Sequence, residues 1–123
     1  GQILEAAMAA PNLPLDNLTV ILDRNKYQND GRTEDIMPLE PLADKWRAFN
    51  WNVVEIDGHD LDQIDAAFAA ADACKGRPTL IYANTIKGKG CSYMLDQPQL
   101  HYTPPTKEQY ESALEELKGS RWF

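Results

Sequence analysis

The sequence has few of the features that mark several large protein classes. Its two cysteines, Cys74 and Cys91, have no metal-type spacing, so a disulfide-rich or zinc-bound fold is not expected. We interpret them as free thiols of a cytoplasmic protein. No run approaches the roughly 18 apolar residues of a membrane span, and residues 1–10 lack the basic start of a signal peptide. We therefore expect no membrane association.

Basic residues are also in the minority, because 12 Lys and Arg stand against 19 Asp and Glu, for a net charge of −7. Affinity for nucleic-acid phosphates comes from clustered Lys and Arg, so we expect no general nucleic-acid binding. The composition is otherwise globular, with 43% hydrophobic and 25% charged residues in 123. This size predicts a single domain over residues 1–123.

The most informative stretch is residues 18–31, LTVILDRNKYQNDG. Residues 18–22 form an apolar run with little alternation, typical of a parallel strand covered on both faces. A polar segment follows, and Asp30-Gly31 predicts a turn. Since open α/β sheets bind ligands beyond the carboxyl ends of their strands, this segment is a candidate site.

The polar segment allows two interpretations. Mg²⁺ prefers oxygen ligands, usually one or two side chains together with phosphate oxygens. Asp23, Asn25 and a nearby backbone carbonyl could supply part of such a site. The same pattern is also typical of a turn whose side chains bond the local backbone. The residues alone leave both interpretations open.

Strand and helix patterns alternate along the rest of the chain. We expect strands at 52–56 and 79–85, helices at 2–10, 40–49, 61–74 and 106–118, and a polar connection at 32–38. This order predicts an α/β fold with a parallel sheet of βαβ units. Trp46 and Phe49 are expected in the core, and Asp60 and Thr106 are expected helix caps. The tail Arg121–Phe123 carries no assignment.

Two later features are chemical candidates. Lys87-Gly88-Lys89-Gly90 follows the third strand, and such a loop either approaches phosphate closely or is a solvated turn. It does not fit the nucleotide P-loop spacing. His101 precedes a proline-rich turn, and neither histidine has a Ser or Cys partner at hydrolase-triad spacing.

These stretches together resemble the thiamine-diphosphate-binding domain of transketolases. LDRNKYQNDG matches the end of that family's cofactor motif, with Arg24-Asn25 where the family more often has Asn-Asn, and TIKGKGCSYM matches its TxKGKGxSxM loop. Gly1-Gln2-Ile3 matches the segment shortly after the GDG that opens the motif, so GDG is expected upstream. We interpret the chain as the C-terminal half of this domain, with a partial thiamine-diphosphate-binding fold. The loop and His101 favour transketolase over 2-oxo acid dehydrogenase or deoxyxylulose-phosphate synthase.

The resemblance implies roles for four residues. Asn25, through its side chain, and Tyr27, through its backbone carbonyl, are implied ligands of Mg²⁺ or Ca²⁺. Asn29 is an implied cofactor contact, at a position where the family often carries an apolar residue against the thiamine. His101 matches the family histidine that contacts the diphosphate or assists proton transfer. Tyr102 stands where the family commonly has Gly.

The family transfers two-carbon ketol units between sugar phosphates, and thiamine diphosphate stabilises the carbanion that this requires. Because the GDG segment and a pyrimidine-binding domain are not in this sequence, we expect the chain to be inactive alone. It would then act as a homo-oligomer or with a complementing transketolase subunit. The alternative is a non-catalytic stand-alone α/β module that acts by self-association or partner binding, so its status as an enzyme stays open.

Overall fold

The computed structural model describes residues 1–13 and 15–119. The chain divides into two compact units, which we call unit 1 (residues 1–24 and 37–85) and unit 2 (residues 25–36 and those from 86 onward). The single domain expected over residues 1–123 stays a prediction. Arg121–Phe123 lies outside the described residues.

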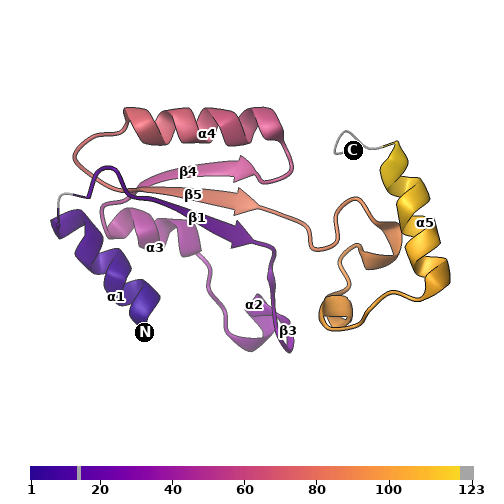
Figure 1. The fold of residues 1–123 in the computed structure, drawn as a ribbon. Helices are drawn as coiled ribbons and strands as arrows, with labels where there is room; N and C mark the ends of the chain where they lie inside the picture. Colours follow the sequence, from indigo (N-terminus) through magenta and orange to yellow (C-terminus); the bar gives the residue numbers. More distant parts are fainter. Residues whose placement is uncertain (14, 120–123) are drawn as a thin grey trace. The chain divides into compact units, whose positions relative to one another are not determined.

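Unit 1 is built on a parallel sheet, which confirms the predicted α/β fold class (Figure 1). Its strands are β1 (Thr19–Arg24), β4 (Asn52–Asp57) and β5 (Thr79–Asn84), in the order β1-β5-β4. Thr79 of the central strand is in register with Thr19 on one side and Asn52 on the other. All three strands therefore end at the same edge of the sheet.

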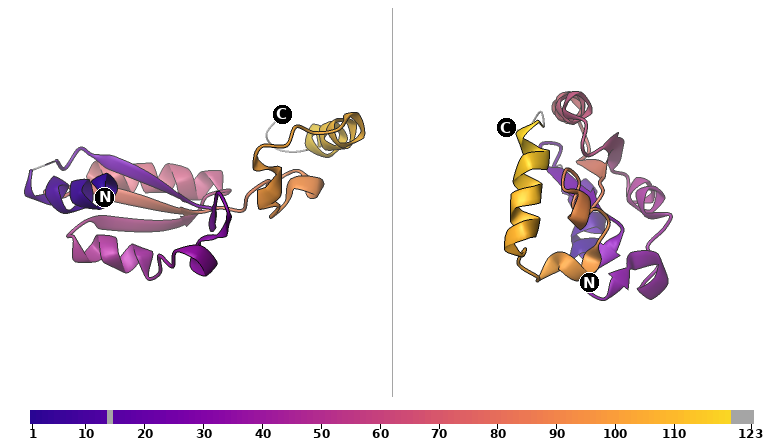
Figure 2. Two further views of the ribbon diagram at one scale, coloured as in Figure 1. Left: turned by 90° about the horizontal axis from the view of Figure 1, so that it is seen from below. Right: turned by 90° about the vertical axis from the view of Figure 1, so that its right-hand side faces the viewer.

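Helices cover both faces of this sheet in unit 1 (Figures 1 and 2). Helix α1 (Gln2–Ala9), extended by the 3₁₀ turn η1 (Ala10–Asn12), lies on one face with α3 (Leu42–Ala48). Helix α4 (Leu61–Ala73) lies on the other face. Its first turn confirms the predicted cap, because the Asp60 carboxylate accepts from the Asp62 amide at 3.0 Å.

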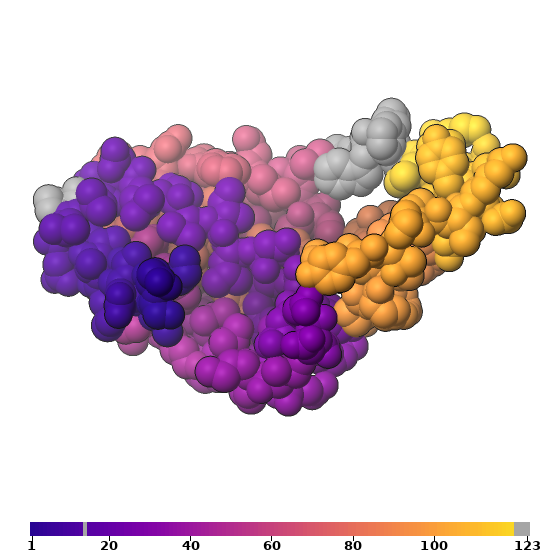
Figure 3. All heavy atoms as spheres, turned by 60° about the horizontal axis from the view of Figure 1, so that its bottom comes forward, coloured from indigo at the N-terminus to yellow at the C-terminus, as the bar shows by residue number. Residues whose placement is uncertain are grey.

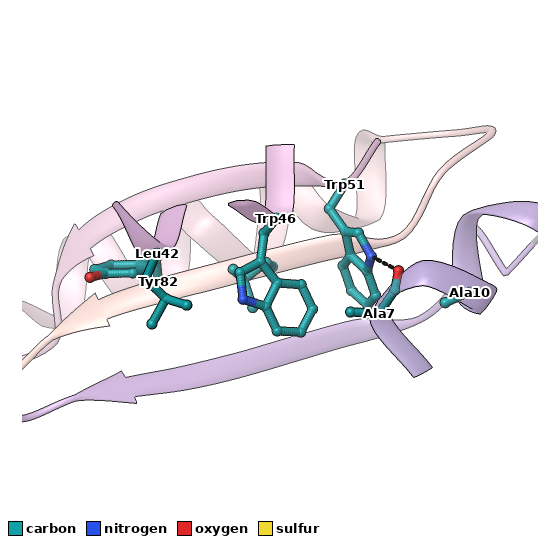
Figure 4. Close-up of a cluster of buried hydrophobic side chains, with 7 residues drawn as sticks. Ala7, Ala10, Leu42, Trp46, Trp51 and Tyr82 are labelled. Atoms are coloured by element: carbon teal, nitrogen blue, oxygen red, sulfur yellow. Dashed lines mark hydrogen bonds between the residues drawn. The ribbon is translucent and has the colours of Figure 1, made fainter. Parts of the chain in front are cut away.

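Unit 1 has two hydrophobic cores, one on each face of the sheet, and side chains of β5 alternate between them. Leu80 and Tyr82 point toward α1 and α3, whereas Ile81 and Ala83 point toward α4. In the first core, the rings of Trp46 and Trp51 meet edge to face with centroids 4.8 Å apart (Figure 4). The burial of Trp46 confirms its predicted place in the core, and Phe49 is partly buried against it.

The expectation that β1 is covered on both faces is wrong for this chain. Ile21 is paired with Ile81 on the α4 face, yet it is 58% exposed. The reason is that β1 is an edge strand of the described sheet, and α4 packs on β4 and β5. Apolar side chains of α1 also lie at the surface of unit 1, including Ile3 at 71% exposure. Figure 3 shows atoms of this N-terminal helix, in indigo, at the surface.

Two predicted boundaries also change. The predicted polar segment 23–26 is partly strand, because β1 continues through Arg24. Arg24 is only 5% exposed, and its guanidinium pairs with the Glu40 carboxylate at 3.0 Å. The other Glu40 oxygen accepts from the Leu42 amide at 2.8 Å, so the helix expected from residue 40 begins at Leu42. The hydrogen bond from the Leu42 amide, and after it the contact with Arg24, lowers the pKa of Glu40 below its ordinary value.

Unit 2 contains several short elements and one longer helix. They are the strands β2 (Tyr27–Gln28) and β3 (Gly31–Arg32), the helices α2 (Thr33–Ile36) and α5 (Lys107–Lys118), and the 3₁₀ turns η2 (Ser92–Met94) and η3 (Pro98–His101). Part of the predicted polar connection at 32–38 is thus helical. Thr106 and Gln109 form a complete capping box at the start of α5, which confirms that predicted cap.

Candidate functional site

One wall of the candidate site is a hairpin in unit 2. Strands β2 and β3 pair antiparallel, with Tyr27 opposite Arg32 and Gln28 opposite Gly31. The turn is therefore Asn29-Asp30, one residue earlier than predicted. Gly31 has φ +151°, and an added Cβ would lie 3.3 Å from the Ile36 Cδ1 atom, so a glycine suits this position.

The two predicted metal ligands lie at the start of this hairpin. The Asn25 Oδ1 atom accepts a hydrogen bond from the Tyr27 amide at 2.9 Å. This is the side-chain-to-backbone turn that was one of the two interpretations of the polar segment. The next pair along the hairpin is hydrogen-bonded, because the Thr33 amide donates to the Lys26 carbonyl at 3.0 Å. Hydrogen-bonded and non-hydrogen-bonded pairs alternate in an antiparallel ladder, so Tyr27 and Arg32 form a non-hydrogen-bonded pair. The Tyr27 amide and carbonyl consequently point away from β3. The Asn25 oxygen and the Tyr27 carbonyl thus lie on the same side of the hairpin.

The second wall is the segment that starts with the KGKG loop. Gly88 has φ +74°, and a Cβ there would lie 2.2 Å from the Met94 carbonyl oxygen. Only glycine fits this position without moving the backbone. The Asp96 amide donates to the Lys87 carbonyl at 2.8 Å and closes the loop. The glycine-rich sequence therefore serves a tight fold that also presents the Lys87 side chain.

These two walls enclose a cavity of about 260 Å³. The hairpin contributes Asn25, Tyr27, Gln28 and Asn29, and the second wall contributes Lys87, Pro98, His101 and Tyr102. All four residues to which the resemblance assigned a role line this one cavity. Asp23, the other suggested metal ligand, does not line it, and its carboxylate accepts from the Thr85 hydroxyl. Sequence reasoning missed Gln28 and Pro98, and no local pattern marks either.

The charge at the cavity comes from Lys87, whose Nζ atom lies 3.2 Å from Nδ1 of His101. An ammonium group can only donate, so in this contact Nδ1 accepts and the ring carries its proton on Nε2. A neutral His101 ring in this contact can donate from Nε2. A cation surrounded by amide groups suits an anionic ligand such as a phosphate.

Several polar contacts join the walls. The Tyr102 hydroxyl donates to the Asn29 Oδ1 atom at 2.7 Å. Arg32 pairs with the Asp96 carboxylate at 3.1 Å, and its guanidinium lies 5.1 Å from the centre of the Tyr27 ring. Partial burial, followed by the hydrogen bond to Asp96, raises the pKa of the Tyr27 hydroxyl above its ordinary value.

A cofactor site here would use mostly neutral oxygens. Within the described parts of the chain, no three His, Cys, Asp or Glu side chains gather as a metal-binding group. Asn25 and Tyr27 nevertheless fit a Mg²⁺ ion whose remaining ligands are phosphate oxygens and water.

Among residues 1–13 and 15–119, no helix combines the length and the apolar character needed to cross a bilayer.

Comparison with known proteins identifies the family. The sequence profile described as transketolase, thiamine diphosphate binding domain, matches residues 1–119. The chain belongs to this transketolase family. It is 48% identical over 118 residues to a 6-deoxy-6-sulfo-D-fructose transketolase subunit, SqwG, of Clostridium sp. (strain MSTE9), covering 96% of this chain and 43% of that protein. It is 44% identical to an apulose-4-phosphate transketolase subunit of Phocaeicola vulgatus, covering 95% of this chain and 42% of that protein.

Solved transketolases share this fold. The Leishmania mexicana enzyme gives a TM-score of 0.87 at 29% identity, over 96% of this chain and 18% of the other. The Campylobacter jejuni enzyme gives 0.85 at 28% identity, over 93% of this chain and 18% of the other. The chain thus spans less than half of the two relatives named above and less than a fifth of these two transketolases.

Proposed function

We propose that this chain is part of a transketolase-like enzyme that uses thiamine diphosphate to transfer two-carbon ketol units between sugar phosphates. The observation that carries the proposal is the convergence of Asn25, Tyr27, Asn29 and His101 on one cavity. They come from two segments that lie more than 70 residues apart, as the Asn29–Tyr102 bond between the same segments shows. The transketolase subunits among the relatives support the same function.

The proposed cofactor site assigns a role to each wall. The Asn25 oxygen and the Tyr27 carbonyl would hold Mg²⁺ or Ca²⁺, whose preference for oxygen ligands the diphosphate would also meet. Lys87 adds positive charge beside the diphosphate, and the Asn29 amide belongs to the same surface. This division fits the neutral donors of the hairpin, because the negative charge that the ion needs comes with the cofactor.

The bound thiamine diphosphate would supply the electron sink for breaking the carbon–carbon bond next to a carbonyl. His101 is the residue of this chain placed to donate a proton or a hydrogen bond at that site. With Lys87 at Nδ1, a neutral ring carries its proton on Nε2 and can donate from there. His101 would then contact the diphosphate or assist proton transfer on the bound sugar phosphate.

The proposal includes a second polypeptide component. The relatives named as transketolase subunits support this component, and we infer that the chain is inactive alone and acts in a homo-oligomer or with a complementing transketolase subunit. The cytoplasmic location belongs to the same proposal.

A reconstitution assay tests this function. Ketol transfer from a sugar phosphate is measured for the chain alone and for the chain mixed with complementing polypeptides that supply the GDG segment and the pyrimidine-binding domain, in both cases with thiamine diphosphate and Mg²⁺. We expect activity only in the mixture, and a loss of about 10²–10⁴-fold in kcat/KM for His101→Ala. His59→Gln is the matched control and should retain activity. Ketol transfer by the chain alone would contradict the need for a partner, and an inactive mixture would contradict the function.

The alternative function is a non-catalytic module that acts by self-association. The observation in its favour is the edge strand β1 with the exposed side chain of Ile21. Sedimentation velocity tests it, because association through this edge should be abolished by Ile21→Lys. A monomer at all concentrations would rule the alternative out.

A further inference from the structure

The adjacent residues His101 and Tyr102 each contact a side chain from elsewhere in the sequence, 14 residues away for His101 and 73 for Tyr102. Lys87 lies against Nδ1 of His101, and the Tyr102 hydroxyl donates to Asn29. The two rings also touch each other edge to face, with centroids 4.5 Å apart and planes at 71°. A displacement of the Tyr102 ring would therefore be felt directly by the His101 ring.

Burial does not fix the Tyr102 ring, since this residue is 77% exposed. An exposed aromatic side chain samples several rotamers unless a specific contact selects one. The bond to Asn29, at 2.7 Å, is such a contact. One neutral hydrogen bond of this kind changes a local equilibrium constant by about two- to tenfold, enough to select one rotamer of an exposed side chain.

Asn29 is well placed to act as the anchor. It sits in the two-residue turn of the hairpin, whose register is set by the Tyr27–Arg32 and Gln28–Gly31 pairs. The hairpin is joined to the opposite wall a second time by the Arg32–Asp96 ion pair at 3.1 Å. Asn29 is thus carried by an element that is itself tied to the segment containing His101.

We propose that Asn29 and Tyr102 are positioning residues, whose hydrogen bond holds the His101 ring where Lys87 donates to Nδ1. The His101 Nε2–H is then the donor presented at the cavity. The positioning of His101 is independent of the proposed function, and only the role of His101 toward cofactor or substrate rests on it. Asn29 acts on His101 through Tyr102, which is a different role from the direct cofactor contact implied by the resemblance.

Nuclear magnetic resonance of the isotopically labelled 123-residue chain tests this without any cofactor. The His101 ring signals are assigned with His59→Gln, since the chain has two histidines. The wild-type chain should show cross-peaks between the Tyr102 ring and the Asn29 side chain, and between the His101 ring and the Lys87 side chain. Tyr102→Phe and Asn29→Ala should each lose both sets, and the double variant should lose no more than either single variant.

Matched variants separate positioning from general damage. Asn29→Asp keeps an acceptor for the Tyr102 hydroxyl and should restore both sets of cross-peaks. Tyr110→Phe removes the hydroxyl of another exposed tyrosine and should leave them unchanged. The Ser92 amide, which donates to Glu116, reports whether unit 2 is folded in each variant, and the Trp51 and Leu80 signals report on unit 1.

The proposal is overturned if Tyr102→Phe keeps the His101–Lys87 cross-peaks at full intensity, or if the wild-type chain lacks the Tyr102–Asn29 cross-peaks. It is also overturned if Asn29→Asp behaves like Asn29→Ala. Because no cofactor is present, these outcomes are independent of the reconstitution assay. An inactive mixture with all cross-peaks intact would contradict the proposed function and leave the positioning pair standing.

Discussion

Units 1 and 2 are held together by different kinds of interaction. Unit 1 has an apolar core around Leu80, Trp46 and Trp51, which are between 0% and 4% exposed. In the described part of unit 2, Thr33 is the only buried residue. Its elements are joined instead by hydrogen bonds and ion pairs, among them Arg32–Asp96 and Tyr102–Asn29.

The interactions that stabilise the fold and the residues of the candidate site therefore lie in different units. Burial of apolar side chains contributes several kcal/mol per large residue, whereas a hydrogen bond contributes about 1 kcal/mol and an exposed ion pair less. Unit 1 therefore supplies stability, and the candidate site lies in the unit with the weaker interactions. Low local stability is common where a ligand must enter and leave.

The largest expected effect comes from the centre of unit 1. Leu80→Ala removes a fully buried side chain from the central strand β5 and should lower the free energy of unfolding by about 2–5 kcal/mol. Urea unfolding followed by tryptophan fluorescence measures the change. Leu114→Ala, at a half-exposed position on α5 of unit 2, is the control and should cost less than about 1 kcal/mol. Equal costs would contradict the contrast between the units.

A second comparison lies within the unit 1 core. The Trp51 Nε1–H donates to the Ala7 carbonyl at 2.7 Å (Figure 4), whereas Trp46 Nε1 is the buried side-chain atom without a hydrogen-bond partner among the described residues. Trp51→Phe leaves a carbonyl unpaired and should cost about 1–3 kcal/mol more than Trp46→Phe. Thermal unfolding of both variants measures the difference. A larger cost for Trp46→Phe would show that ring volume outweighs the hydrogen bond.

Acid should loosen unit 2 through Glu116. Its carboxylate accepts from the Ser92 hydroxyl and the Ser92 amide, both at 2.6 Å, and these bonds lower its pKa below the ordinary 4.5. The stabilisation is therefore present above pH 4.5 and is lost as the pH falls through the lower folded-state pKa. The Ser92 amide signal should shift over that range.

The variant Glu116→Gln should abolish this shift, because a neutral amide does not titrate. Glu111→Gln is the control on the same helix, since Glu111 pairs only loosely with Lys107 at 3.8 Å, and the shift should remain. A Ser92 signal that moves equally in both variants would assign the acid response to another group.

The smallest effect is expected at the Arg32–Asp96 pair. Both side chains are about half exposed, so Asp96→Asn should cost less than about 1 kcal/mol. The cost should shrink further at about 1 M salt, where the screening length is about 3 Å. Thermal unfolding, followed by nuclear magnetic resonance signals of the β2–β3 hairpin at low and high salt, measures this cost. A cost that is insensitive to salt would indicate packing of Arg32 on the Tyr27 ring instead.

Local sequence patterns predicted much of unit 1. The alternation of strands and helices predicted the parallel sheet, and the cap residue Asp60 was predicted from its spacing to the helix start. In unit 2, Thr106 was predicted as a cap in the same way. The exposure of Ile21 could not be predicted, because it depends on which strand lies at the edge. The burial of Arg24 could not be predicted either, since its partner Glu40 lies 16 residues further along the chain.

The candidate site was predicted through the family resemblance and not from local pattern. Asn25 and His101 acquire meaning only because folding brings their segments to one cavity. The bond between Asn29 and Tyr102 spans 73 residues, and no sequence period indicates it. Tyr102 was marked in the sequence as a departure from the family pattern, and that departure was the one signal that could have led to the bond.

The most direct test of the account is calorimetric titration of thiamine diphosphate into the chain mixed with a complementing subunit. The account predicts binding that requires Mg²⁺, that is lost in Asn25→Ala, and that is retained in Asn17→Ala, an exposed asparagine of unit 1. Binding that is indifferent to Mg²⁺ and to Asn25, or no binding at all, would contradict it.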